Sequence, residues 1–312
     1  EWVIDAARGA GAERVLAVVR PGDGVAEGLP DGIEVVEQRE GEGTGAAVLA
    51  ARDAVLGADR GASGGGGAPV VVLSGDQPLI TPEQLEGLLA EHAERGALAT
   101  LLTPDRIDPA GYGRVVRDRN GAVDRIYETK YAEGLTREEL AAREINLGTY
   151  VFDPRALFTA LGEVGLERGE RYLTGVIPAI RRSGGTVAAH LTDDADAALG
   201  VNDRAGLMRV EEAAQRRILD EHARAGVTFL HPGTTRVEAD VTIGRDTTIG
   251  PGTVLEGTTT VGERCELGPH TTARDATIRD GATVIHSFVL EAEVGEDVRV
   301  GPFAYLRPGT IV

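Results

Sequence analysis

The last third of the chain carries an apolar residue at every sixth position, and this rhythm restricts its fold more than any other feature of the sequence. The step of six runs first through Ile243, Ile249, Leu255, Val261, Leu267 and Ala273. After one slip it continues at Ile278, Val284 and Leu290, and after a second at Val294, Val300, Leu306 and Val312. Hexapeptide repeats of this kind stack as a parallel β-helix whose apolar residues point into a narrow prism. We therefore predict a β-helix over residues 227–312.

The first two hundred residues alternate helical and strand-like segments, which predicts a mostly parallel sheet covered by helices. The predicted strands are 14–19, 33–36, 70–73, 98–103, 144–151 and 186–191, with a hairpin that pairs 115–116 with 122–127. The predicted helices begin at residue 1 and continue at 46–56, 82–95, 169–182 and 200–225. A glycine-rich surface insertion covers 57–69. The expected domains are 1–204 for the sheet, 205–226 for a linker helix and 227–312 for the β-helix.

Both ends of the sequence suggest a longer protein. The chain opens at Glu1 with a helix, whereas a parallel-sheet domain is expected to begin with a strand, so we expect at least one strand and its loop upstream. The last repeat ends at Val312 without a capping element, which would leave an open strand edge. We expect the native chain to continue there.

The charge balance and the cysteine content exclude several classes of partner. The formal net charge of −18 argues against nucleic acid and anionic membranes, which are bound by clustered lysines and arginines. Cys265 is the single cysteine, which rules out an intrachain disulfide and fits a reducing compartment. No apolar run approaches the roughly 20 residues of a membrane span. We expect a cytoplasmic protein.

A buried strand that ends in a carboxylate is the most informative spot in the first domain. Val70–Leu73 is apolar and stops at Ser74-Gly75-Asp76. In an open α/β sheet, ligands bind beyond the carboxyl ends of the strands, so Asp76 is placed to hold a substrate or its metal. The alternative is that Asp76 only caps the helix that follows. The strand itself leaves both interpretations open.

Four other polar or glycine-rich spots are ambiguous in the same way. The loop Gly41-Glu-Gly-Thr-Gly45 lies between a strand and a helix, where glycines either cradle a phosphate or simply turn the chain. Glu128 and Lys130 share one face of an extended segment and could be only an exposed ion pair. Asn146 is either a surface residue or a reader of sugar hydroxyls. Asn202 or Asp203 could be no more than the N-cap of the helix that begins there.

These motifs occur in an order that resembles one enzyme family. The series is Gly-Asp-Gln-Pro-Leu, Gln-x-x-x-x-Gly-Thr-Gly, Asp-Pro-x-Gly-Tyr-Gly-Arg, Glu-x-Lys, Glu-Ile-Asn-x-Gly, Gly-Val-Asn-x-Arg and the hexapeptide repeats, which close on Gly301-Pro-Phe-Ala-Tyr-Leu-Arg-Pro-Gly309. It resembles the bifunctional bacterial N-acetylglucosamine-1-phosphate uridylyltransferase and glucosamine-1-phosphate acetyltransferase over essentially the whole chain. The resemblance implies a Rossmann-like α/β nucleotidyltransferase followed by a left-handed parallel β-helix that forms a homotrimer.

The resemblance also assigns roles to residues. It implies that Asp76 and Asn202 are catalytic Mg²⁺ ligands, and that Gln38, Gly43 and Thr44 contact the uracil and the nucleotide. It implies sugar contacts at Gly113, Glu128 and Asn146, beside the strand-end positions Ser74 and Gly75. Arg307 resembles a phosphate-binding arginine of the acetyltransferase site, which uses acetyl-CoA. Ser74 departs from the family, because some members have a tyrosine there.

The implied chemistry suits these residue types. N-Acetylglucosamine 1-phosphate has a second pKa of about 6, so at neutral pH it is mostly a dianion that can attack the α-phosphorus of UTP without a general base. The protein must then position the substrates and neutralise charge, and carboxylate and amide oxygens suit Mg²⁺. In-line attack expels pyrophosphate and leaves UDP-N-acetylglucosamine.

Two departures from the family limit this expectation. The family's N-terminal glycine-rich loop and the lysine that follows it hold the triphosphate, and neither is in this sequence. Several acetyltransferase residues of the family lie beyond Val312. We therefore expect this chain to be impaired in both activities. The alternatives are another sugar-1-phosphate nucleotidyltransferase, and a non-catalytic scaffold subunit.

Overall fold

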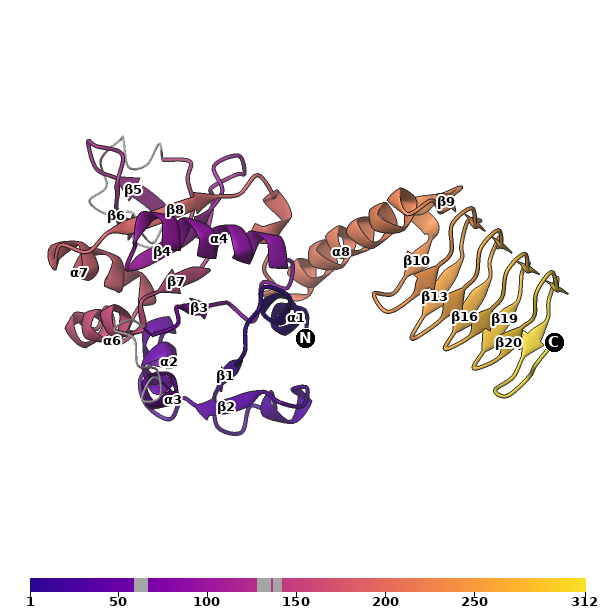
Figure 1. Cartoon of the computed structure of the whole chain (residues 1–312), viewed down its shortest axis with the longest axis horizontal. Helices are drawn as coiled ribbons and strands as arrows, with labels where there is room; N and C mark the ends of the chain where they lie inside the picture. The colour runs from indigo at the N-terminus through magenta and orange to yellow at the C-terminus, as the bar shows by residue number, and fades with distance from the viewer. Residues whose placement is uncertain (59–66, 128–135, 137–141) are drawn as a thin grey trace. The chain divides into compact units, whose positions relative to one another are not determined.

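The structure, a computed structural model, describes residues 1–58, 67–127, 136 and 142–312. It divides into two compact units, Glu1–Leu207 and Met208–Val312. The boundary falls in the first turn of the long helix α8 (Arg204–Arg224) (Figure 1). Most of the predicted insertion at 57–69 lies outside the described residues, as do Glu128 and Lys130.

A four-stranded sheet forms the centre of the first unit. Its strands, in spatial order, are β3 (Val70–Val72), β7 (Tyr150–Phe152), β4 (Ala99–Thr103) and β8 (Val187–Leu191). β4 and β8 are parallel, and β7 runs antiparallel to both of its neighbours. Three of the four strands therefore share one direction, and the predicted α/β class is confirmed with β7 as the reversed strand.

Two smaller pairs of strands accompany the central sheet. β1 (Leu16–Val19) and β2 (Glu34–Glu37) are parallel, and β5 (Arg114–Arg117) and β6 (Val123–Tyr127) form the predicted antiparallel hairpin. Short 3₁₀ turns cover Ala26–Gly28, Leu173–Gly175 and Ala195–Ala198.

Helices cover both faces of the central sheet because successive strand residues point to opposite sides. Leu101 of β4 packs into a cluster with α6 (Pro154–Glu163) and α7 (Val176–Arg182). Leu102, the next residue, packs into a second cluster with α4 (Pro82–Arg95) and α1 (Trp2–Gly9). Both leucines are fully buried. Burying such a side chain stabilises the folded state by about 1.5–3 kcal/mol relative to leaving it exposed.

Three segments of the first unit differ from their predicted structure. The predicted helix 46–56 is two helices, α2 (Thr44–Ala50) and α3 (Arg52–Ala58). The helix predicted from residue 169 begins only at Val176, because the backbone of Arg171 is hydrogen-bonded to Glu42 and Gly45 instead. The strand predicted over 144–151 is regular only from Tyr150, because Gly148 turns the chain at a φ of 74°. The helix α6, whose N-cap is Asp153, was not among the predicted elements.

The second unit is the β-helix that the repeats predict (Figure 1). Its strands form three parallel sheets, β10-β13-β16-β19-β22, β11-β14-β17-β20 and β21-β18-β15-β12-β9. The strand bounds, from β9 to β22, are Thr228–Phe229, Arg236–Val237, Thr242–Ile243, Thr248–Ile249, Val254–Glu256, Thr260–Val261, Glu266–Leu267, Thr272–Arg274, Thr277–Ile278, Thr283–Val284, Phe288–Leu290, Glu293–Val294, Arg299–Val300 and Tyr305–Leu306. A 3₁₀ turn covers Pro232–Thr234. Gln215 and Leu219 of α8 pack against the first coil.

One predicted inward residue of the β-helix is wrong. The repeat count places Leu290 in the core, but Val289 is the fully buried residue and Leu290 is only half-buried. Val289 pairs with Ala273 of the coil before and with Leu306 of the coil after. The count failed because two successive corners are each one residue short, so the steps from Val284 to Val289 and from Val289 to Val294 are both five.

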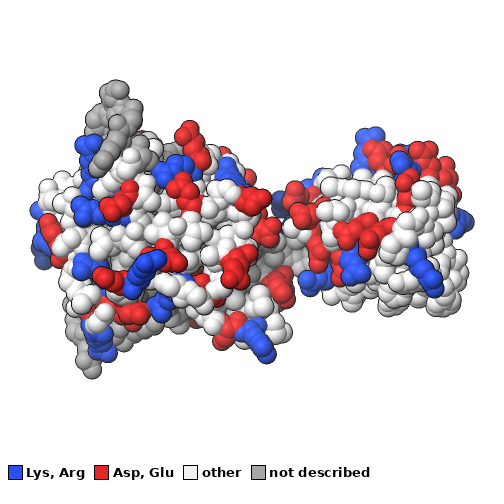
Figure 2. All heavy atoms as spheres, turned by 90° about the horizontal axis from the view of Figure 1, so that it is seen from below, with Lys and Arg blue, Asp and Glu red and all other residues white. Residues whose placement is uncertain are grey.

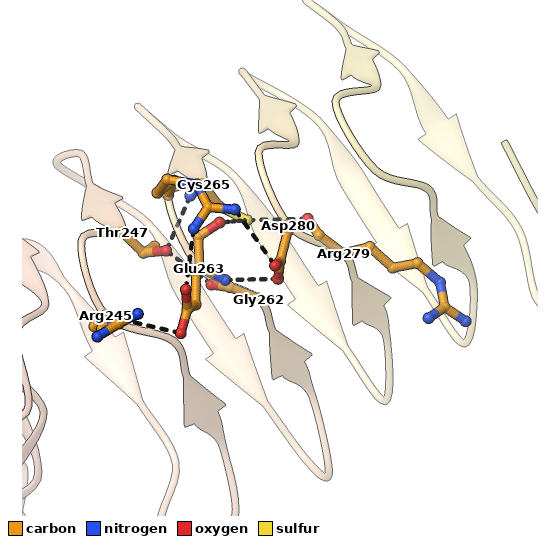
Figure 3. Close-up of polar contacts among 8 residues, drawn as sticks. Arg245, Thr247, Gly262, Glu263, Cys265, Arg279 and Asp280 are labelled. Atoms are coloured by element: carbon orange, nitrogen blue, oxygen red, sulfur yellow. Dashed lines mark hydrogen bonds and ion pairs between the residues drawn. The ribbon is translucent and has the colours of Figure 1, made fainter.

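A second inward column, two residues before each apolar one, consists mostly of small residues, and several of these are threonines or serines whose hydroxyls bond to the backbone. The Thr247 hydroxyl donates to the carbonyl of Gly262 and accepts from the amide of Cys265, one coil further on (Figure 3). On the outer surface of the same corner, Glu263 accepts from Arg245, and its amide donates to Asp280 (Figure 3). Burial raises the pKa of the Cys265 thiol. Neighbouring coils are thus joined by polar bonds as well as by strand pairing.

The helices among the described residues are too short or too polar to span a bilayer.

Candidate functional site

The carboxyl end of β3 lies against the segment that precedes α8. The backbone carbonyl of Asp76 accepts a hydrogen bond of 2.8 Å from the amide of Val201. A Cβ added to Gly200 would lie 3.7 Å from Oδ2 of Asp76, an ordinary van der Waals distance, so the two segments are in contact. Two segments far apart in the sequence thus bring Asp76 and Asn202 to the same edge of the sheet.

Other residues cap the helices that follow Asp76 and Asn202. Thr81 caps α4 in a capping box with Gln84. Oδ1 of Asp203 accepts a 2.6 Å hydrogen bond from the amide of Gly206 and so caps α8. Asp76 and Asn202 are exposed, and within the described residues their side chains have no hydrogen-bond or ion-pair partner. Two oxygen-bearing side chains at one edge are therefore available to a ligand.

The predicted sugar-side residues adjoin this edge. Because β3 pairs with β7, Ser74 lies beside the turn at Gly148, where an added Cβ would be 3.4 Å from Oγ of Ser74. Asn146 is joined to this turn, since its Oδ1 accepts a 3.2 Å hydrogen bond from the amide of Gly148. The amide of Asn146 donates to the carbonyl of Gly113 at 2.8 Å. Backbone and side-chain contacts thus join one group, which consists of Ser74, Gly75, Asp76, Gly113, Asn146 and Asn202.

Tyr112, which has no role among the predicted site residues, also belongs to this group. Its hydroxyl donates a 2.9 Å hydrogen bond to the carbonyl of Ala198 and so ties the loop before Gly113 to the segment that leads to Asn202. The signal was present in the sequence, because Tyr112 is the aromatic residue of the Asp-Pro-x-Gly-Tyr-Gly-Arg motif.

The predicted nucleotide-side residues form a second group, around the N-terminus of α2. Gly43 has a φ of 94°, and a Cβ there would lie 2.5 Å from the carbonyl oxygen of Arg171. The amide of Gly45 donates to that same carbonyl, and the Thr44 hydroxyl accepts from the amide of Leu173. The glycines of this loop therefore permit close packing against residues 171–173. Gln38, the first residue after β2, donates to the carbonyl of Gly41 at 3.0 Å.

Two predicted site residues are not placed in either group. Glu128 lies outside the described residues. Arg307 belongs to the second unit, where it is exposed in the turn after β22.

Two ion pairs anchor the β5–β6 hairpin, one to the segment that carries Asn146 and one to α7. Arg117 donates to both carboxylate oxygens of Glu144 at 2.6 Å, and this bonding raises the pKa of the guanidinium. Arg181 donates to Asp118 at 2.7 Å and lowers the pKa of that carboxyl group. Elsewhere, on the face seen in Figure 2, basic and acidic side chains are interspersed and form no continuous basic patch.

The carboxylate of Asp76 and the amide oxygen of Asn202 are ligand types that suit a hard cation. The described residues contain no cluster of three or more His, Cys, Asp or Glu side chains able to hold a metal. One carboxylate and one amide oxygen make only a partial shell, as is usual for Mg²⁺, which keeps waters and shares the phosphates of its substrate.

Comparison with known proteins identifies both units. The model of the MobA-like NTP transferase domain matches residues 1–175, and that of the bacterial transferase hexapeptide (six repeats) matches 240–275. The whole chain is 43% identical to the bifunctional protein GlmU of Halalkalibacterium halodurans and 39% identical to that of Caldanaerobacter subterraneus. It spans 67% and 66% of these two relatives. The GlmU of Mycolicibacterium vanbaalenii is 46% identical over 77% of this chain and 49% of its own length.

Proposed function

The chain belongs to the family of the bifunctional GlmU proteins, and from that premise we propose that its first unit joins UTP to N-acetylglucosamine 1-phosphate, which yields UDP-N-acetylglucosamine and pyrophosphate. The observation that carries the proposal is the juxtaposition of Asp76 with the segment Gly200–Asn202 at the sheet edge, beside the group that contains Asn146. The family assignment based on the sequence motifs is confirmed.

Asp76 and Asn202 would hold Mg²⁺. Both side chains present oxygen atoms, and the capping tasks that would otherwise occupy them are done by Thr81 and Asp203. Bound there, Mg²⁺ would offset the negative charge of the phosphate groups.

The remaining residues bind and orient the two substrates. The sugar phosphate is already a dianion at neutral pH, so no residue has to remove a proton from it. Asn146 and Gly113 would bind the N-acetylhexosamine, and their shared backbone hydrogen bond fixes their spacing. Gln38, Gly43 and Thr44 would contact the nucleotide, with Glu128 as a further sugar contact. Holding the reacting groups in line supplies most of the rate enhancement in such phosphoryl transfers.

The second unit would be the acetyltransferase module, which uses acetyl-CoA to acetylate glucosamine 1-phosphate, with Arg307 as a phosphate contact. We further propose that it associates as a homotrimer. Phe288, Phe303 and Tyr305 are 50%, 85% and 56% exposed, and the Phe288 and Tyr305 rings lie tilted against each other with centroids 6.2 Å apart. Such an apolar surface fits burial between copies. Phe303→Ser with Tyr305→Ser should therefore yield monomers in sedimentation, and monomeric wild-type chain would contradict the trimer.

We propose a cytoplasmic location, in keeping with the single, reduced Cys265.

The binding of UDP-N-acetylglucosamine by calorimetry, with and without Mg²⁺, tests the first proposal. We expect Mg²⁺ to strengthen binding by wild type and to have no effect on Asp76→Asn, which keeps the size of the side chain but lacks its charge. Asp5→Asn, an exposed carboxylate of α1, is the matched control and should behave as wild type. If neither Mg²⁺ nor Asp76→Asn changes the affinity for UDP-N-acetylglucosamine, the proposed metal site is refuted.

A further inference from the structure

The side-chain amide of Asn146 is fixed from two sides. Its Nδ2 donates a 2.7 Å hydrogen bond to the hydroxyl of Tyr150, and its Oδ1 accepts from the amide of Gly148 at 3.2 Å. An amide group offers two N–H donors and two lone pairs. One N–H and one lone pair of the half-buried Asn146 are thus used within the protein, and one of each remains for a ligand.

These two bonds also determine which way round the amide lies. The backbone N–H of Gly148 can only donate, so it requires the oxygen of Asn146 on its side. If the amide were rotated by half a turn, two N–H groups would face each other. The Tyr150 hydroxyl holds the nitrogen on the opposite side, and the exposed donor and acceptor therefore keep one arrangement.

Tyr150 is anchored more firmly than Asn146. It is 3% exposed and lies in β7, where it pairs with Val72 of β3 and Leu101 of β4. Its ring stacks on Phe152 with centroids 5.4 Å apart. The hydroxyl position is consequently set by the central sheet and not by the loop that carries Asn146.

The other end of the same segment is anchored by a charge pair. Glu144 accepts two 2.6 Å hydrogen bonds from Arg117 of the hairpin and a 2.8 Å hydrogen bond from the hydroxyl of Thr103 at the end of β4. Bidentate bonds of this type restrain orientation as well as distance. Asn146 thus sits between an ion pair two residues before it and a core hydroxyl four residues after it.

We propose that Tyr150 is a positioning residue for the sugar half of the site. Its hydroxyl holds the Asn146 amide so that the free N–H and lone pair are presented in one orientation to an N-acetylhexosamine 1-phosphate, while Arg117 and Glu144 hold the start of the segment. This inference rests on the proposed function. It adds an orienting role for a residue that does not itself contact the substrate.

Tyr150→Phe tests the proposal because it removes one oxygen atom and keeps the ring in the core. Loss of one hydrogen bond should raise the Kd for N-acetylglucosamine 1-phosphate about tenfold. The Kd for UTP and the melting temperature should stay close to wild type. Tyr305→Phe, in the second unit, is the matched control and should change neither affinity. An unchanged affinity of Tyr150→Phe for the sugar phosphate would overturn the proposal.

A measurement without substrate separates this inference from the proposed function. The side-chain amide resonances of Asn146, identified by their loss in Asn146→Asp, should shift in Tyr150→Phe but not in Tyr305→Phe. If they do not move, the positioning role is wrong. If they shift as expected but wild type binds no sugar phosphate, the fault lies in the proposed function and not in the role of Tyr150.

Discussion

The identity of the inward residue on β19 can be tested by a pair of alanine substitutions. Val289 is fully buried between Ala273 and Leu306. The next residue, Leu290, is only half-buried. Val289→Ala removes two methyl groups, and Leu290→Ala removes one more carbon than that. If size alone decided the outcome, Leu290→Ala would be the more damaging change.

The structure predicts the opposite order. Deleting a single buried methyl group costs about 0.5–1.5 kcal/mol, so Val289→Ala should lower the stability of the β-helix by about 1–3 kcal/mol. Neighbouring coils cannot close the gap easily, because strand pairing and the polar bonds between coils fix their spacing. Leu290→Ala should lower the stability of the β-helix by less than about 1 kcal/mol, because the side chain of Leu290 is already partly exposed to water.

Hydrogen exchange measured by mass spectrometry on peptides within 283–300 reports this difference. A loss of about 1.4 kcal/mol corresponds to tenfold faster exchange where exchange follows local opening. Exchange in the first-unit strand β4 serves as the internal control and should not change. Equal acceleration in both variants, or a larger effect of Leu290→Ala, would show that the register assigned to β19 is wrong.

Two further predictions concern the first unit. Burial lowers the pKa of His92 in α4. As the pH falls through the usual histidine pKa of about 6.5, the unfolded chain therefore binds more protons than the folded chain, and the free energy of unfolding falls. His92→Gln should flatten that slope in urea unfolding followed by Trp2 fluorescence, and an unaltered slope would refute the assignment. Gly43→Ala should lower the free energy of unfolding by about 1–3 kcal/mol, because Gly43 has a φ of 94° and lies against the carbonyl of Arg171. Gly57→Ala, whose Cβ would meet nothing, should be neutral or stabilising, and equal costs for the two would count against the packing argument.

The parts of the fold that were predictable from the sequence are those specified by local repetition. The hexapeptide period indicates the β-helix because every coil presents the same apolar position to the same core. The end of β3 was recognisable for a similar reason, since four apolar residues and a sharp stop at Ser-Gly-Asp need no distant partner to be informative. Leu290 was misassigned because the period itself changes there, and composition does not reveal a corner that is one residue shorter.

The parts that were not predictable depend on distant contacts. The segment before Val176 has helical composition, but Arg171 forms backbone bonds with Glu42 and Gly45, about 130 residues earlier in the sequence. That residues other than Asp76 and Asn202 cap α4 and α8 was likewise visible only in the structure, where Thr81 and Asp203 do the capping. The internal partners of Asn146 had no sequence signal beyond the aromatic residue four positions later.

The unequal coils of the β-helix have an evolutionary consequence. Leu255 pairs with Ala273, eighteen residues on, but Ala273 pairs with Val289, only sixteen on, and the inward column stays in register. The two missing residues come from the corners, where positive φ angles occur at Asp275 and His286. We therefore expect a single-residue deletion to be tolerated better at a corner than on a side, where it would turn the inward residue out to solvent. Among homologues, length variation should accumulate at the corners while the sides remain constant in length.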